Sequence, residues 1–176
     1  NNFKIEKIIL NTGKKSRLEN ELIINNNHIK IEYYSQKILN IANYPFYFLN
    51  KSNFLDINDN SIIIYTIINN HKILLTGDIS TKIEKNIINE YDLSNIDILK
   101  IAHHGSITST SNEFLTKINP KYALISVGIN NKFNHPHPVV IDRLKNNNIK
   151  TYLTSIHGSV MFKFFHNNIT IKYSKP

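Results

Sequence analysis

Three short apolar runs in this chain each end in a polar loop that carries histidine or aspartate. The runs are "KILL", "ILKIA" and "ALISVG", and the loops that follow them are "TGDIS", "HHGS" and "NNKFNHPHP". Segments with helical spacing of apolar residues separate the runs, and this alternation predicts strands joined by helices in a layered α/β sheet. Because the loops at the carboxyl ends of such strands meet at one sheet edge, we expect the three loops to form one site.

The remaining pattern predicts strands first and then strands alternating with helices. Two apolar runs around the turn "NNHK" indicate a β-hairpin. Ser80 and Ser111 stand where helix caps are expected, and Pro138 lies near the first turn of a further helix. Residues 36–60, with their aromatic cluster, indicate a loop or a short strand. The predicted strands are 3–11, 28–35, 61–68, 72–78, 96–102, 122–128, 150–155, 159–165 and 168–174, and the predicted helices are 16–24, 81–92, 112–118 and 138–148.

Composition limits the kinds of site that the chain can build. It has no cysteine, so disulfides and thiolate ligands are excluded and any metal must be bound by histidine and carboxylate. Its 176 residues, 41% of them hydrophobic, fit one domain, and no apolar run is long enough for a membrane-spanning helix. The net charge of +8 suits a polyanion such as nucleic acid or an acidic membrane surface. A genome rich in A and T would favour the same Asn, Ile and Lys content without any such partner.

Asp78 follows Gly77 at a strand end and precedes a helix. A carboxylate in this position serves either as a functional group of the site or as a partner for free N–H groups at the helix start, and the sequence leaves both open. His103 and His104 directly follow a strand. On an extended segment their side chains would point to opposite sides, so one would bind a metal while the other supports it or contacts substrate. A pair of packed loop histidines is the alternative.

Gly105 permits close approach of the backbone, and the hydroxyls that follow it lead into a helix start, where free N–H groups favour a phosphate. The same hydroxyls would serve equally well as a capping run. His135 and His137 lie in "NHPHP", whose alternating prolines stiffen the loop and place both rings on similar sides. The residues predicted to bind substrate are Ser106, Thr108, Ser109 and Thr110.

A serine nucleophile is the competing chemistry. Ser106, with a neighbouring histidine and Asp78, has the residue types of a triad, but "HHGS" lacks the G-x-S-x-G turn, so metal chemistry ranks far above it. The other histidines have no central role: His71 is expected in a turn, His157 of "IHGS" at the edge of the site at most, and His28 and His166 on the surface.

The motifs together resemble the carboxy-terminal metallo-β-lactamase-like domain of ComEC-type competence proteins. "LLTGDIS…E", "DILKIAHHGSITSTSNEFL", "PKYALISVGINNKFNHPHPVVIDRL" and "YLTSIHGSVMF" occur in the same order, between about residues 60 and 162. The resemblance implies the αββα sandwich of metallo-hydrolases. It implies that Asp78 bridges metals and that His104, which has an H-x-S spacing, is a ligand, with His103 ligating or supporting it. His135 and His137 would contact the phosphate or assist proton transfer.

The resemblance also implies a function. In that family two divalent ions, here Mn²⁺ or Zn²⁺, activate a water and clamp a phosphodiester. We therefore expect a metal-dependent phosphodiesterase or nuclease acting on single-stranded DNA, within a larger bacterial membrane protein whose channel segments lie upstream. Two alternatives stay open: a non-catalytic nucleic-acid-binding or channel-associated module, and a soluble hydrolase of small phosphoesters.

One motif of the family is missing, because no His-x-His-x-Asp-His occurs in the sequence. "NNFKIEKIIL" resembles the segment that follows that motif, so we expect residues 1–176 to be a single domain that lacks its first strands. A fragment, a truncated gene product and a degenerate copy all fit. The ligands that remain are too few to hold two metals firmly. An uncovered sheet edge would then favour self-association.

Overall fold

The computed structural model describes residues 4–12, 17–26 and 28–175. Strands and helices lie close to the predicted ranges, and the alternation of strand and helix in the second half is confirmed. The strands are β1 (Lys7–Leu10), β2 (Lys30–Tyr33), β3 (Lys37–Ile41), β4 (Tyr44–Phe48), β5 (Ile64–Ile68), β6 (His71–Leu75), β7 (Ile98–Lys100), β8 (Tyr122–Ile125), β9 (Lys150–Leu153), β10 (Val160–Phe165) and β11 (Asn168–Tyr173). The helices are α1 (Arg17–Asn25), α2 (Thr81–Glu90), α3 (Asn112–Ile118), α4 (Pro138–Asn146) and α5 (Thr154–His157), with 3₁₀ turns η1 (Asn58–Asn60) and η2 (Ala102–Gly105).

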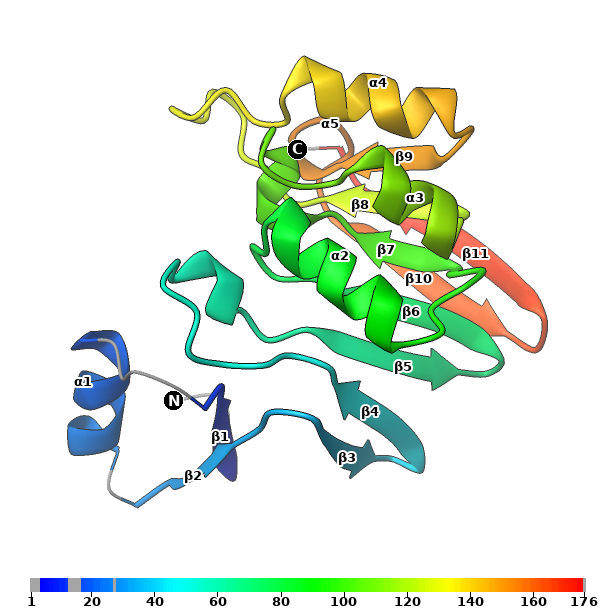
Figure 1. The fold of residues 1–176 in the computed structure, drawn as a ribbon. Helices are drawn as coiled ribbons and strands as arrows, with labels where there is room; N and C mark the ends of the chain where they lie inside the picture. The colour runs from blue at the N-terminus through cyan, green and yellow to red at the C-terminus, as the bar shows by residue number, and fades with distance from the viewer. Residues whose placement is uncertain (1–3, 13–16, 27, 176) are drawn as a thin grey trace.

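A mixed sheet of seven strands, in the order β3-β4-β5-β6-β7-β8-β9, forms the centre of the structure (Figure 1). Strands β3 to β6 pair antiparallel, and β6 to β9 pair parallel. Helices α2, α3 and α4 connect the parallel strands and pack on one face. The antiparallel ribbon β10–β11 lies against the other face. The layered α/β class is therefore confirmed, with the described residues arranged as helices, sheet and ribbon.

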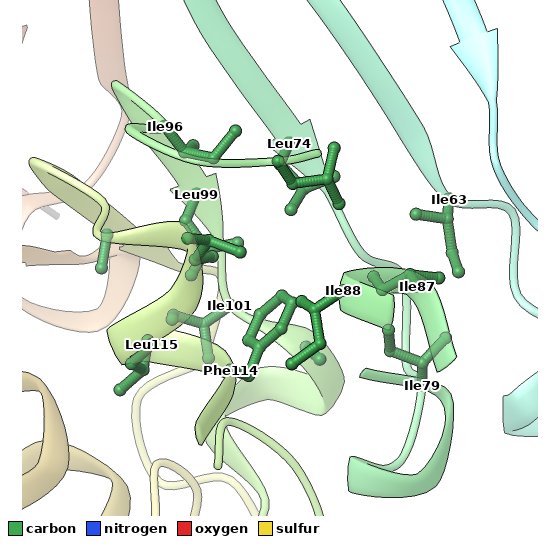
Figure 2. Close-up of a cluster of buried hydrophobic side chains, with 14 of the residues drawn as sticks. Ile63, Leu74, Ile79, Ile87, Ile88, Ile96, Leu99, Ile101, Phe114 and Leu115 are labelled. Carbon is green, nitrogen blue, oxygen red and sulfur yellow. The ribbon is translucent and has the colours of Figure 1, made fainter. Parts of the chain in front are cut away.

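The helix face of the sheet carries the main core (Figure 2). The apolar stripe of α2 is buried there, with Ile83 and Ile87 each 3% exposed. Leu74 and Leu99 meet this stripe from β6 and β7, and Phe114 of α3 fills the space between the helices. Since burial of one large aliphatic side chain contributes about 1.5–3 kcal/mol, these contacts fix the helices firmly on the sheet.

The ribbon covers the opposite face through alternate residues. Phe162 and Phe164 point toward the sheet and are half-buried, while Met161 and Phe165 are 54% and 72% exposed. The ring of Phe164 stacks on His71 at 5.3 Å. The prediction that His71 lies in a turn is therefore wrong. It begins β6 and is 5% exposed, because the hairpin turn is only Asn69 and Asn70.

Residues 36–60 were expected to form a loop or a short strand, and they form the strand pair β3–β4 that extends the large sheet. Strands β1 and β2 form a separate parallel pair, joined through α1. Edge strand β3 exposes Ile38 and Ile41 to 57% and 50%. Self-association through this edge stays a prediction. In the described ranges, no helix combines the length and apolar character needed to cross a membrane.

A buried carboxylate joins α2 to the loop before α3. Glu84 is 0% exposed, and its two oxygens accept the backbone N–H groups of Thr110 and Ser111, the latter at 2.9 Å. Burial raises the pKa of Glu84, and the two backbone hydrogen bonds oppose that shift. Arg143 of α4 donates to the carbonyls of Ser109 and Thr110 at 3.2 and 3.1 Å. The loop is therefore held between two helices by polar contacts.

Replacement of Glu84 tests this network. Glu84→Ala leaves two buried N–H groups without partners and should lower the free energy of unfolding by about 2–5 kcal/mol. Glu84→Gln keeps one acceptor oxygen and should lie between Ala and the unaltered chain. Urea unfolding followed by circular dichroism measures both, with Lys85→Ala, an exposed change on the same helix, as control. A loss no larger than that of the control would contradict the role assigned to Glu84.

Candidate active site

The loops after β6, β7 and β8 lie side by side at one edge of the sheet, as the sequence predicts. The backbone N–H of His103 donates to the carbonyl of Gly77 at 3.1 Å, which joins the first loop to the second. The N–H of His137 donates to the carbonyl of Gly105 at 2.9 Å, which joins the second loop to the third. The three loops are thus connected through their backbones.

The first loop presents Asp78. A Cβ on Gly77, whose φ is +58°, would lie 2.5 Å from the Cβ of Ser61, so only glycine permits this close turn. The hydroxyl of Ser61 accepts the N–H of Asp78 at 3.0 Å. Ser80 occupies the N-cap position of helix α2, as predicted, but its side chain makes no capping hydrogen bond. The Asp78 side chain is 38% exposed and faces the next loop, which favours the functional over the capping alternative.

The second loop presents His103 and His104, both in left-handed backbone conformation with φ of 49° and 55°. The prediction of an extended segment with rings on opposite sides is therefore wrong, and the ring centroids lie 6.5 Å apart at a steep angle. Nδ1 of His104 lies 2.6 Å from the carbonyl oxygen of Ser126, which can only accept, so this nitrogen carries the proton. Nε2 of His104 lies 3.9 Å from Oδ1 of Asp78. Histidines that ligate metals are oriented in this way.

The third loop presents His135 next to His103, with ring centroids 5.7 Å apart. Burial and the nearby His103, His104 and His137 lower the pKa of His135, and Asp78 opposes that shift. His135 is therefore neutral near pH 7 and able to accept a proton. Its backbone is held on both sides by Asn131, whose side-chain oxygen accepts the His135 N–H at 2.9 Å and whose amide donates to the His135 carbonyl at 2.7 Å.

His137 caps helix α4. Its Nδ1 accepts the N–H of Val139 at 3.3 Å, which fixes the tautomer and leaves Nε2 with a proton to donate. This capping role was not anticipated from the sequence. Its predicted contact with phosphate stays a prediction.

The run of hydroxyls lies mostly inside the protein. Ser109 and Thr110 are 0% and 1% exposed, and the Ser109 hydroxyl donates to the carbonyls of Ala102 and Ser106. Ser106 is 6% exposed, and its hydroxyl lies 3.0 Å from that of Thr108, the exposed member of the set. The structure thus gives these residues a role in holding the loop and offers no support for the predicted phosphate cradle. Ser111 caps α3, as predicted, by accepting the N–H of Phe114.

The donor set partly fits a divalent ion. Carboxylate and imidazole are the ligands that Zn²⁺ and Mn²⁺ use, and the oriented pair of Asp78 and His104 suits one ion. Among the residues that the structure describes, however, no three such side chains converge in an arrangement that could hold a metal. Asp78 and His104 are therefore candidate ligands only, and the described residues form no full coordination shell.

Two features of the site were missed from the sequence. Lys100 of β7 is half-buried near Asp78, whose charge acts on it, and its ammonium donates to the carbonyls of Gly77 and Ile101 at 3.4 and 3.2 Å. A lysine inside the apolar run "ILKIA" was the available signal. The second feature is a cavity of about 200 Å³ that opens beside the histidines. It is lined by His104, Val127, Gly128, Asn131, Phe133 and His135.

The sequence of the chain is similar to those of several known proteins. No model of a known protein family matches the chain. It is 33% identical to ComE operon protein 3 of Bacillus subtilis (strain 168) over 107 residues, which are 61% of the chain. It is 35% identical to Competence protein ComA of Neisseria gonorrhoeae over 121 residues, or 66% of the chain, and 35% identical to Recombination protein 2 of Haemophilus influenzae over 118 residues, or 67%. The chain is a homologue of one segment of the ComEC-type competence proteins.

The chain spans 14 to 17% of the length of these three ComEC-type relatives. A solved structure also aligns with it, that of a putative Zn-dependent hydrolase of the metallo-β-lactamase superfamily from Thermotoga maritima. That alignment has a TM-score of 0.40 and 12% identity, and it covers 71% of this chain and 74% of the other.

The contact between the second and third loops is testable at Gly105. Its φ is +83°, and an added Cβ would lie 2.6 Å from the Cβ of Pro136. Gly105→Ala should therefore push the two histidine loops apart and cost about 2–4 kcal/mol of unfolding free energy. Gly128→Ala is the matched control, because no heavy atom lies within 4 Å of its added Cβ. Denaturant unfolding and histidine NMR shifts measure the effect. Equal results for both variants would show that the contact between Gly105 and Pro136 does not hold the two loops together.

Proposed function

We propose that this chain carries part of the active site of a metal-dependent phosphodiesterase that acts on single-stranded DNA in a DNA-uptake protein. The observation that carries the proposal is that the three loops bearing Asp78, His103, His104 and His135 meet at one sheet edge. The homology to ComEC-type competence proteins supports DNA as the substrate, and the net charge of +8 suits a polyanion.

Each residue has a chemical role in this proposal. Asp78 and His104 would hold a divalent ion, with His103 as a further ligand or a support. Such ions polarise the phosphodiester and supply an activated water when bound. His135, neutral because of its lowered pKa, accepts a proton, and His137 offers its Nε2–H to a phosphate oxygen. Lys100 places a positive charge near Asp78. Burial lowers the pKa of Lys100, and the charge of Asp78 opposes that shift.

The ligand count sets a condition on activity. Structural sites of Zn²⁺ use four protein ligands and catalytic sites use three, whereas no three such side chains of the described residues are arranged to hold a metal. The remaining ligands would come from water, from substrate, or from protein outside the described residues. In the ComEC-type setting, that further protein is the larger membrane protein with its channel segments.

Cleavage of a labelled single-stranded oligonucleotide with added Mn²⁺ or Zn²⁺ tests the proposal. Asp78→Asn removes an anionic ligand, so we expect the cleavage rate to fall by at least about 100-fold, beyond the usual effect of residues that only support ligands. Metal binding measured by calorimetry should weaken in parallel. Asp142→Asn, an exposed acid on α4, is the matched control.

The outcome also separates the substrate classes. Cleavage that persists in EDTA, or that is unchanged in Asp78→Asn, would refute the metal role. Hydrolysis of a small model diester without cleavage of the oligonucleotide would instead favour the small-phosphoester hydrolase.

A non-catalytic nucleic-acid-binding module is the second candidate. It is favoured by the lack of three converging metal ligands among the described residues, together with the net charge. In that case DNA binding would weaken steeply with salt, because counterions are released, and would be unchanged by metal. Binding titrations at several salt concentrations, with Mn²⁺ and with EDTA, measure this directly.

A further inference from the structure

The loop after β8 exposes a large aromatic ring beside the histidines. Phe133 is 66% exposed and lines the cavity of about 200 Å³ together with His104 and His135. Its ring stacks on that of His135, with centroids 5.9 Å apart and an angle of 22° between the planes. Phe133 thus offers an open aromatic face at the edge of the cavity.

We propose, resting on the function proposed above, that Phe133 is a stacking platform for one base of a single-stranded nucleic acid. Every base has a flat face that stacks on an aromatic side chain whatever its sequence. The cavity is smaller than the roughly 300–1,000 Å³ of pockets for drug-sized ligands, so it suits one planar ring better than a peptide segment.

The platform is prepared before any ligand arrives. His135 supports one side of the Phe133 ring, and Asn131 holds the backbone of His135 through two hydrogen bonds. A ring fixed in this way loses little entropy when a base stacks on it. Phe133 therefore differs from an aromatic side chain that is exposed by chance on a mobile loop.

The charge beside the platform matches a nucleotide. The ammonium of Lys132 lies 5.0 Å from the centroid of the Phe133 ring. At an exposed site this cation–π contact is weaker than base stacking, so a base can displace the ammonium, which is then free to meet a phosphate. None of the six described residues that line the cavity is acidic. The lining therefore presents no carboxylate to a polyanion.

The position of Phe133 beside the histidines determines which kind of nucleic acid can bind. Phe133 contacts His135, and His135 contacts His103. A base stacked on Phe133 would therefore lie close to His135 and to the histidines of the second loop. The phosphate of the same or the next nucleotide would then reach His104. A base paired in a duplex cannot offer its face, so the platform selects single strands.

Oligonucleotide binding in EDTA tests the platform without requiring catalysis. The probes are a fluorescently labelled strand of twelve thymidines and a strand of equal length with abasic sites in place of the bases, followed by anisotropy. Phe133→Ala should weaken binding of the thymidine strand about five- to 100-fold and leave the abasic strand unchanged. Phe133→Tyr should restore binding, because it keeps the ring. Phe165→Ala is the matched control, since Phe165 is also exposed, at 72%, but lies on the ribbon.

The outcomes are distinct. Equal binding of the thymidine strand by Phe133→Ala and the unaltered chain would overturn the platform, while Asp78-dependent cleavage would leave the proposed function standing. Equal weakening of both strands by Phe133→Ala would also overturn it, because the loop and not the ring would then be responsible. Binding of neither strand by the unaltered chain in EDTA would overturn the platform, whereas the proposed function is tested separately by cleavage with added Mn²⁺ or Zn²⁺.

Discussion

The site depends on the parallel pairing of β6, β7 and β8. In this register Leu75 pairs with Lys100, and Lys100 pairs with Leu124, so the three strands end almost level. Level parallel strands release their following loops at one edge, and the helices that return the chain occupy the face behind them. Asp78 and His135, which are about sixty positions apart in the sequence, thereby lie in neighbouring loops at this edge.

Polar contacts then fix the loops that the sheet has brought together. Glu84 is buried at a cost, which its raised pKa reflects, and its two backbone hydrogen bonds offset that cost. Gly105 allows the second loop to touch Pro136 of the third. The hydroxyls of the loop after η2 also hold this loop through hydrogen bonds inside the protein. The loop therefore presents histidines to solvent and turns its hydroxyls inward.

The groups that face solvent form two kinds of surface. Asp78 and His104 are the proposed metal ligands, and the carbonyl of Ser126 orients the His104 ring. Phe133 with Lys132 forms an aromatic and cationic surface on the same side. In the functions proposed above, the first surface would meet the phosphate of a nucleotide and the second would meet its base.

The sequence by itself determined the strand and helix pattern, the amphipathic face of α2, and the positions of Asp78 and the histidines at strand ends, because these follow from local periodicity and turn residues. It did not determine that His71 is buried against Phe164, that His103 and His104 take left-handed conformations, or that Ser109 and Thr110 face inward. Those outcomes depend on contacts between segments far apart in the chain. Only the tertiary structure decides which atoms of these segments meet, because burial and hydrogen bonding between distant loops leave no pattern in the local sequence.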